Sequence, residues 1–260
     1  MQTTFTRGQI KQRAKERMKG HFGEAFALNS LPIIAGIIAY GLLLASIITL
    51  IIFANKFPNI FSTDNLTIGD LNTSYQNSQN SVDFRIGGQA FGGLFGAILN
   101  AGISVTSLRW LRQDQDQPLT HPFIKQFEGF SQFFLPFLAL CLMTSLITGL
   151  AALALAIPGI IVGLAYAPIY LLYADDGAKY GVINMLGHSW RFMKGHKVDW
   201  FVFQLSFIPW YFGVILTGGL LNIYFLPYHN LAVAAFYESL RQENELKTAT
   251  ASDENTDSRL

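Results

Sequence analysis

The feature that most constrains this chain is an apolar stretch, residues 31–54, that contains no charged side chain. A helix needs about 20 consecutive apolar residues to cross the hydrocarbon core of a bilayer. The whole chain is 51% hydrophobic and only 13% charged, whereas about a quarter of the residues in a soluble domain are charged. These properties indicate an integral membrane protein, for which lipid rather than water is the main solvent.

Further uncharged stretches are long enough for additional crossings. Two of these uncharged stretches are too long for a single crossing by a helix that rises about 1.5 Å per residue. Pro158-Gly159 divides one of them, and Gly218-Gly219 divides the other. We therefore expect an all-α, polytopic transmembrane helical bundle with about six spans. The predicted spans are 31–54, 86–108, 133–155, 159–174, 200–217 and 220–237.

The basic residues are distributed very unevenly around these predicted spans. Of the 18 Lys and Arg residues, only Lys56 and Arg85 fall on one side of the predicted topology. Because Lys and Arg collect on the cytoplasmic side of membrane proteins, we expect a multi-pass membrane protein with cytoplasmic N and C termini. The formal net charge is only +1, so no nucleic-acid partner is expected.

Three regions follow from this topology. Residues 1–30 form a basic cytoplasmic segment, residues 31–240 form the membrane domain, and residues 241–260 form a cytoplasmic tail rich in acidic residues, Thr, Ala and Ser. The composition of the tail predicts disorder. Cys141 is the only cysteine, so neither an intrachain disulfide nor a cysteine-based metal cluster is expected.

Residues 6–20 have the pattern of a short basic amphipathic helix. Ile10, Ala14 and Met18 recur at every fourth position, and Lys or Arg occupy most of the remaining face. Such a helix is expected to lie in the plane of the headgroups, where anionic lipid attracts each basic side chain with about 1 kcal/mol. The main interpretation is that these charges set the topology, and specific recognition of lipid is the alternative.

A second interfacial helix is predicted at residues 176–194. Asp175 and Asp176 are positioned to cap its N-terminus. Its apolar positions follow helical spacing, and they are Ile183, Leu186, Trp190 and Met193. We expect this helix to lie on the same side of the membrane as the first one.

Both predicted interfacial helices end in the same four residues, Met18-Lys19-Gly20-His21 and Met193-Lys194-Gly195-His196. A glycine just beyond the last turn can adopt the left-handed conformation that ends a helix. The match continues at the same offset, since Glu24 corresponds to Asp199. We interpret these segments as an internal structural repeat, which would be parallel in the membrane, unlike the inverted repeats of many transporters.

The basic residues of the two interfacial helices are candidates for contacts with lipid headgroups. They are Lys11, Arg13, Lys15, Arg17, Lys19, Arg191, Lys194 and Lys197. The expected partners are membrane lipids that carry negative charge, or another membrane protein.

A metal or phosphate site could also be drawn from polar residues near the second interfacial helix. They are Asp175, Asp176, His188, His196 and Asp199. Asp at a helix start and His at an interface have structural explanations, however. We therefore expect no metal and no cofactor.

Small residues recur at every fourth position in two of the predicted spans. Such a stripe lets helix backbones approach closely in a membrane, where hydrophobicity gives no drive to associate. The helix-packing candidates are Gly88, Gly92, Gly96, Gly159 and Gly163. Packing within one chain is the main interpretation, and a homodimer face is the alternative.

Several polar residues lie in or near the predicted spans, but none of them is an acid. Ion-coupled carriers usually keep ionisable groups at mid-membrane, so the pattern disfavours a coupled transporter. An uncharged permease path stays open as an alternative, and it would be lined by Asn100, Gln204, Asn222 and His229. The chain contains no P-loop, nucleophile elbow or His-Glu-x-x-His motif, and we expect no enzymatic activity.

From Tyr166 onward, the chain carries a combination of short motifs. They are Tyr173-Ala174-Asp175-Asp176, Ser189, Met193-Lys194-Gly195, Leu205-Ser206-Phe207-Ile208, Trp210, Pro227-Tyr228 and Ala235-Phe236-Tyr237-Glu238. In these motifs, and in its basic N-terminal helix, the chain resembles the bacterial integral membrane proteins of domain of unknown function family 975. The resemblance implies a polytopic plasma-membrane protein without an assigned activity.

Three classes of function stay open. The leading hypothesis is a non-enzymatic structural or interaction protein that engages anionic lipids or another membrane protein through its basic cytoplasmic face. One alternative is a permease-like, uncoupled transporter of a small solute. The other is a membrane enzyme that acts on lipid headgroups, with its site in the loop between Asp175 and Asp199.

Overall fold

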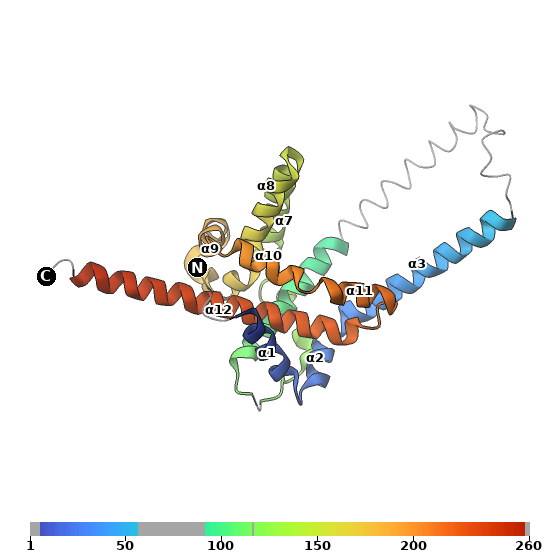
Figure 1. Cartoon of the computed structure of the whole chain (residues 1–260), viewed down its shortest axis with the longest axis horizontal. Coiled ribbons are helices and arrows are strands. Elements are labelled where there is room, and N and C mark those ends of the chain that lie inside the picture. Colours follow the sequence, from blue (N-terminus) through green and yellow to red (C-terminus); the bar gives the residue numbers. More distant parts are fainter. Residues whose placement is uncertain (1–5, 57–91, 116, 258–260) are drawn as a thin grey trace.

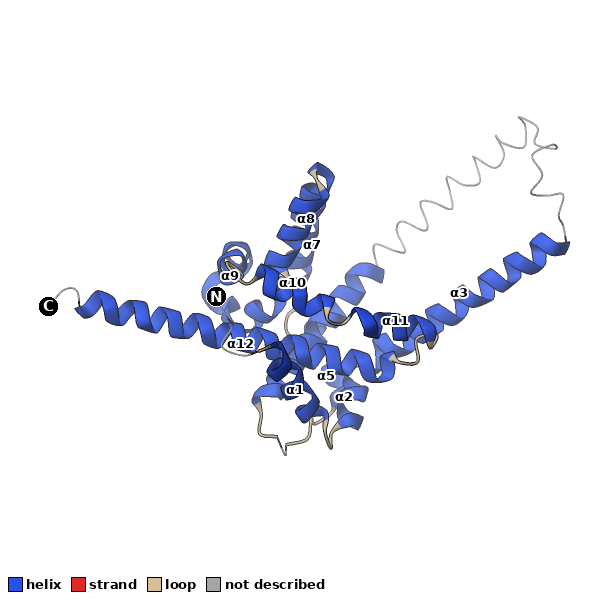
Figure 2. Cartoon of the chain, viewed as in Figure 1, coloured by secondary structure: helices blue, strands red, loops and turns tan. Residues whose placement is uncertain are grey.

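The computed structural model describes residues 6–56, 92–115 and 117–257. Every regular element within those ranges is a helix, which confirms the all-α fold class (Figure 2). Gly88 and Arg85 lie outside the described residues, as does the first part of the second predicted span.

One helix, between α3 and α5, is named by its residues. In order they are α1 (Arg7–Met18), α2 (Phe22–Leu28), α3 (Ser30–Lys56), the helix Gly92–Arg112, α5 (Pro122–Lys125), α6 (Glu128–Ser131), α7 (Phe134–Ala154), α8 (Ala156–Tyr166), α9 (Ile169–Phe192), α10 (Lys197–Leu205), α11 (Ile208–Leu216) and α12 (Asn222–Asp257).

Four helical segments are long and apolar enough to cross a membrane, as expected of a membrane protein. They are α3, the helix Gly92–Arg112, Phe134–Leu153 of α7, and Lys197–Leu216, which combines α10 and α11. A fifth candidate is the pair of α8 and α9, which is bent by 52°. The predicted number of six spans is not confirmed, because most of the segment 220–237 lies in α12, which is not among the candidates.

The first half of α12 forms the centre of the protein core. In Figure 1, α12 runs along the longest axis, and the hairpin of α7 and α8 points upward from it. Phe225, Leu231, Phe236 and Leu240 of α12 are each 1% exposed. The Phe236 ring packs against Phe203 of α10 at a centroid distance of 4.8 Å. Most apolar side chains in the first half of α12 are therefore covered by other helices of the protein.

Helix α1 packs against α12 instead of presenting its apolar face to lipid headgroups. Ile10, Ala14 and Met18 are each at most 4% exposed and belong to the main buried cluster. Full burial of a large aliphatic side chain stabilises a folded protein by about 1.5–3 kcal/mol. The attraction between one basic side chain and anionic lipid is smaller, about 1 kcal/mol. The apolar side of α1 is therefore covered by α12 and the rest of the core.

Asp175 and Asp176 do not cap a helix. Helix α9 begins at Ile169, has Pro168 at its N-cap, and continues past both aspartates to Phe192. The predicted helix 176–194 is thus part of a longer helix that is kinked at Gly181, where φ is 67° and ψ is −177°. The capping prediction was wrong because arginines of other helices, and not N-terminal amides, balance the charge of the aspartates.

The region predicted to be a disordered tail instead continues α12 as far as Asp257. Ion pairs between residues four positions apart stabilise the extension. Arg241 Nε lies 3.1 Å from Glu245 Oε1, and Lys247 Nζ lies 2.7 Å from Glu243 Oε1. Composition alone indicated disorder because it ignores this spacing of opposite charges.

One close helix crossing involves glycines that the spacing pattern did not identify. A Cβ atom on Gly102 would lie 2.6 Å from the backbone nitrogen of Gly129 in α6. By contrast, the Cβ positions of Gly92 and Gly96 have no heavy atom within 4 Å. The closest backbone approach between this helix and α6 is therefore at Gly102, whereas Gly92 and Gly96 of the predicted stripe face open space.

The hairpin of α7 and α8 also contains a close approach. A Cβ atom on Gly159 would lie 2.8 Å from the Cα of Ala152, so the absence of a side chain brings the two helices together at their connection. Gly163 makes a looser contact, with Thr148 Cγ2 at 3.8 Å from its Cβ position.

We predict that Gly102→Ala destabilises the protein, because the added Cβ would overlap the backbone of Gly129. Overpacking of this kind costs about 1–3 kcal/mol, which should lower the midpoint of thermal unfolding in detergent. Gly96→Ala is the matched control, since it lies on the same helix with open space around it and alanine favours helix formation. Equal unfolding midpoints for the two variants would contradict the close crossing.

Candidate functional site

The two tetrapeptides form the same backbone turn. Gly20 has a φ of 85° and Gly195 has a φ of 90°, both in the left-handed region that favours glycine. The methionine before each turn is at most 4% exposed, whereas Lys19 and Lys194 are exposed. Each turn therefore anchors a methionine in the core and leaves a lysine at the surface.

Each turn leads into a helix with a histidine at its N-cap. His21 precedes α2, and His196 precedes α10. In both copies the ring Nδ1 faces an acid three residues later, at 3.4 Å from Glu24 Oε1 and 3.7 Å from Asp199 Oδ2. A carboxylate in the first turn is favourable at the positive end of the helix dipole. The repeat seen in the sequence is thus also a repeat in geometry.

The two copies of the repeat dock on adjacent residues of α12. At the offset that relates the tetrapeptides, Asn29 corresponds to Gln204. Asn230 Nδ2 donates a hydrogen bond to Asn29 Oδ1 at 2.6 Å, and His229 Nε2 lies 3.0 Å from Gln204 Oε1. Two neighbouring polar residues of α12 therefore each bind one copy.

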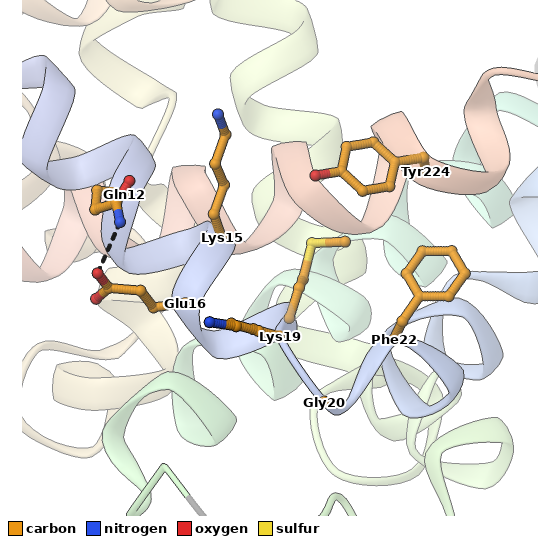
Figure 3. Close-up of a pocket in the computed structure, with 8 residues that line it drawn as sticks. Gln12, Lys15, Glu16, Lys19, Gly20, Phe22 and Tyr224 are labelled. Carbon is orange, nitrogen blue, oxygen red and sulfur yellow. Dashed lines mark hydrogen bonds between the residues drawn. The ribbon is translucent and has the colours of Figure 1, made fainter.

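The first copy lines a groove of about 620 Å³ beside the start of α12 (Figure 3). This groove is termed the α1 groove. It is lined by Gln12, Lys15, Glu16, Met18, Lys19, Gly20, Phe22 and Tyr224. The rings of Phe22 and Tyr224 are stacked at a centroid distance of 6.1 Å and an interplanar angle of 22°.

The α1 groove combines cationic and apolar chemistry. Figure 3 shows Lys15 and Lys19 between the Gln12–Glu16 pair and the two aromatic rings. Both lysines are exposed, while Glu16 Oε1 accepts a hydrogen bond from Gln12 Nε2 at 2.8 Å. The groove therefore suits a ligand with a negatively charged group and an adjoining apolar part.

Lys11, another basic residue of α1, binds its own chain. Its Nζ lies 3.4 Å from the carbonyl oxygen of Ser206 and 4.4 Å from the ring centroid of Phe207. Burial lowers the pKa of Lys11, and the positive charge of Lys15 lowers that pKa further. These contacts tie α1 to the connection between α10 and α11.

Arg17 has a structural role as well, because it is only 3% exposed. Its guanidinium donates to the carbonyl oxygens of Asp114 at 2.6 Å and Gln117 at 3.2 Å, and it lies 4.9 Å from the ring centroid of Trp110. Burial lowers the pKa of Arg17, although the charge of Asp114 opposes this effect. Arg17 is thus occupied by protein groups.

The remaining basic candidates differ in their surroundings. Arg13 is half-buried, while Arg191 and Lys194 at the second turn are exposed. Lys197 Nζ lies 3.5 Å from the ring centroid of Trp190, a close cation–π contact. The exposed basic candidates therefore gather at the two copies of the repeat.

An ion-pair cluster joins α9, α12 and the helix that ends at Arg112. Arg112 donates from both Nη atoms to the two oxygens of Asp175 at 2.8 Å, and from Nε to Glu238 Oε2 at 2.8 Å. Arg241 Nη1 and Tyr237 Oη donate to Asp175 Oδ2 at 2.7 and 2.8 Å. Burial opposes the charged form of Arg241, but the hydrogen bond with Tyr237 and the nearby aspartates raise its pKa.

A cavity of about 450 Å³ adjoins the ion-pair cluster. Within it, His188 stacks on Tyr180 at a centroid distance of 4.2 Å, and His188 Nε2 lies 3.8 Å from Asp176 Oδ2. Its charged lining residues are Asp176, Lys179, Arg241 and Glu245. Because these charges are balanced in sign, they do not select for a strongly anionic or cationic ligand.

The residues considered for a metal or phosphate site are divided between two places. Asp175, Asp176 and His188 lie at or near the ion-pair cluster, whereas His196 and Asp199 belong to the second turn. Among the residues that the structure describes, no three His, Cys, Asp or Glu side chains form a group that could hold a metal ion.

The residues considered for a permease path are dispersed. Gln204 and His229 contact each other, Asn222 lies beside Gly36 of α3, and Asn100 is exposed. None of these residues lines the α1 groove or the cavity beside the ion-pair cluster. The structure therefore does not bring them together around one of these spaces.

Sequence reasoning did not identify the partners of Asp175 or the aromatic wall of the α1 groove. Arg112, Tyr237 and Arg241 are far from Asp175 in the chain, and only folding brings them to it. One signal was available, since the motifs at 173–176 and 235–238 both carried the family resemblance. The presence of both motifs in one family could have suggested that the two segments contact each other in the fold.

Comparison with known proteins gives one match. The model of a family described as "Protein of unknown function (DUF975)" matches residues 146–244. This match confirms the resemblance, and it contains all the motifs of α9 to α12 that indicated it. It therefore includes the second copy of the repeat and most partners of the ion-pair cluster. No curated protein and no solved structure matches the chain.

We predict that Asp175→Asn destabilises the protein, because Arg112 and Arg241 would lose the carboxylate that they share. Loss of these charge-assisted hydrogen bonds should cost about 2–3 kcal/mol, measured by thermal unfolding in detergent. Glu245→Gln is the control, since its carboxylate is 64% exposed and such pairs contribute about 0–1 kcal/mol. An Asp175→Asn variant as stable as the control would argue against a structural role for the cluster.

Proposed function

We propose that this chain is a non-enzymatic, multi-pass protein of the cell membrane that binds anionic phospholipids through the basic side that contains α1. The observation that carries this proposal is the α1 groove. There, two exposed lysines stand beside the rings of Phe22 and Tyr224, which are 40% and 37% exposed. A phosphate headgroup would contact the lysines, and the adjoining apolar part of the lipid would contact the rings.

The place of the groove along the chain supports a lipid ligand. Helix α2 leads from the groove directly into α3, and none of the most apolar window of α3 is buried within the protein. A ligand in the groove would therefore lie next to the point where a lipid-facing helix begins. Aromatic residues favour this interfacial level, and anionic lipid attracts basic side chains there.

We also propose that both termini are cytoplasmic. The last two predicted spans, 200–217 and 220–237, would then form a hairpin that does not cross the membrane. Helices α1 and α2 precede the first span, yet Lys11 contacts Ser206 and Phe22 stacks on Tyr224. Ser206 and Tyr224 thus contact helices that come before the first span in the chain.

The tip of this returning hairpin supports the same topology. Gly219, at the connection of α11 and α12, lies near Ile37 of α3, only about 10 Å along the helix from Ser30 at about 1.5 Å per residue. The crossings would then be α3, the helix Gly92–Arg112, α7, and α8 with the start of α9. Their number stays even, so the distribution of Lys and Arg still favours cytoplasmic termini.

We predict that Lys15→Gln combined with Lys19→Gln weakens binding of phosphatidylglycerol to the purified protein by about 30-fold, at about 1 kcal/mol per lysine. Binding is measured in detergent by native mass spectrometry, with phosphatidylcholine as the neutral lipid. Lys56→Gln is the matched control, because Lys56 is an equally exposed lysine at the opposite end of α3. Unchanged phosphatidylglycerol binding in the double variant would remove the basis of the proposal.

We predict that a cysteine at Thr217 does not react with a membrane-impermeant maleimide added to intact cells. The full-length chain with Cys141→Ala serves as the background. A cysteine at Asn72 should react, because Asn72 lies between the first two predicted spans, on the side opposite the termini. Thr217 is exposed, so the same cysteine should react once the membrane is dissolved in detergent. Labelling of position 217 from outside the cell would instead support six crossings.

A further inference from the structure

We propose that the second copy of the repeat forms a second site for anionic lipid headgroups, built from Trp190, Arg191, Lys194 and Lys197. This inference rests on the proposed function of the α1 groove. It extends that function from one lipid site to a pair of sites related by the internal repeat.

The backbone of the two turns presents the same open surface. Lys19 and Lys194 occupy equivalent positions, and both are exposed. Each is followed by a left-handed glycine, Gly20 or Gly195, and no heavy atom lies within 4 Å of either Cβ position. A headgroup can therefore approach the backbone beside the lysine without meeting a side chain.

Each copy also has one cationic and one aromatic side chain on either side of the turn, in opposite order. In the first copy Lys15 precedes the turn and Phe22 follows it, whereas in the second copy Trp190 takes the place of Lys15 and Lys197 takes the place of Phe22. Lys197 Nζ lies 3.5 Å from the centroid of the Trp190 ring. The same chemistry is thus present at both turns although the residues differ.

The second turn is the more cationic of the two. Arg191 takes the place of Glu16, so the acid that faces the lysines in the α1 groove is replaced by a base. Arg191 and Lys194 are both exposed. The second site should therefore bind an anionic headgroup at least as tightly as the first.

The surroundings of the second turn favour a lipid over a soluble phosphate. The Trp190 ring is 41% exposed, and the apolar side chains of Ile183, Val198 and Phe201 nearby in the chain are 72%, 71% and 42% exposed. Exposed apolar side chains beside tryptophan and basic residues are typical of a surface at the membrane interface. The phosphate bound there would therefore belong to a membrane lipid.

The test counts the phosphatidylglycerol molecules that the full-length protein retains in detergent, by native mass spectrometry. We expect the unmodified protein to retain a pair, and the triple variant Arg191→Gln, Lys194→Gln and Lys197→Gln to retain one, with the lost site weakened about a hundredfold. Lys15→Gln with Lys19→Gln should also leave one, and all five changes together should leave none. Lys56→Gln should leave the pair unchanged.

The outcomes separate this inference from the function on which it rests. If the triple variant retains as much phosphatidylglycerol as the unmodified protein, the second site is refuted while the α1 groove stands. If the unmodified protein retains none, both proposals fail. Excess inorganic phosphate should leave the lipid bound, and its displacement from the second site by phosphate would refute a lipid ligand there. Unchanged unfolding midpoints show that the variants remain folded.

Discussion

The packing of α12 between two copies of one helix-turn-helix segment is the constraint on which the rest of the structure depends. His229 and Asn230 are adjacent on α12, and each contacts the equivalent residue of one copy, Gln204 or Asn29. Around this polar pair, the aromatic and aliphatic residues of α12 fill the core. Because an amide hydrogen bond inside a protein is directional and leaving it unmade is costly, the pair fixes the position of both copies along α12.

The same arrangement explains why the basic residues have different roles. Where helix α1 is packed against the protein, as at Lys11 and Arg17, the positive charge is balanced by carbonyl oxygens and aromatic faces. Where the chain leaves the core at a left-handed glycine, the adjoining lysine is exposed. A charge that is not balanced by its own protein is available to a headgroup. The proposed lipid sites therefore lie at the turns and not along the whole basic face of α1.

The sequence predicted the helical membrane class well, but the predicted number of six spans is not confirmed by the helices that are long and apolar enough to cross a membrane. Uncharged length is a local property, and 31–54 and 133–155 correspond closely to α3 and α7. The segment 220–237 is also uncharged apart from a possible charge on His229, but most of its apolar residues are buried within the protein. Length and hydropathy cannot distinguish a helix covered by lipid from one covered by protein. The repeat was visible because a left-handed turn requires glycine in both copies.

By itself, the sequence determined the helices, the uneven distribution of basic charge and the duplicated turn, since each depends on residues close together in the chain. Tertiary structure alone decided that Asp175 binds Arg112 and Arg241 instead of capping a helix, and that Phe22 and Tyr224 form one wall of a groove. Those contacts join residues that are distant in the chain. Their energy depends on burial and on the distance between charges, and both are set only when the helices pack.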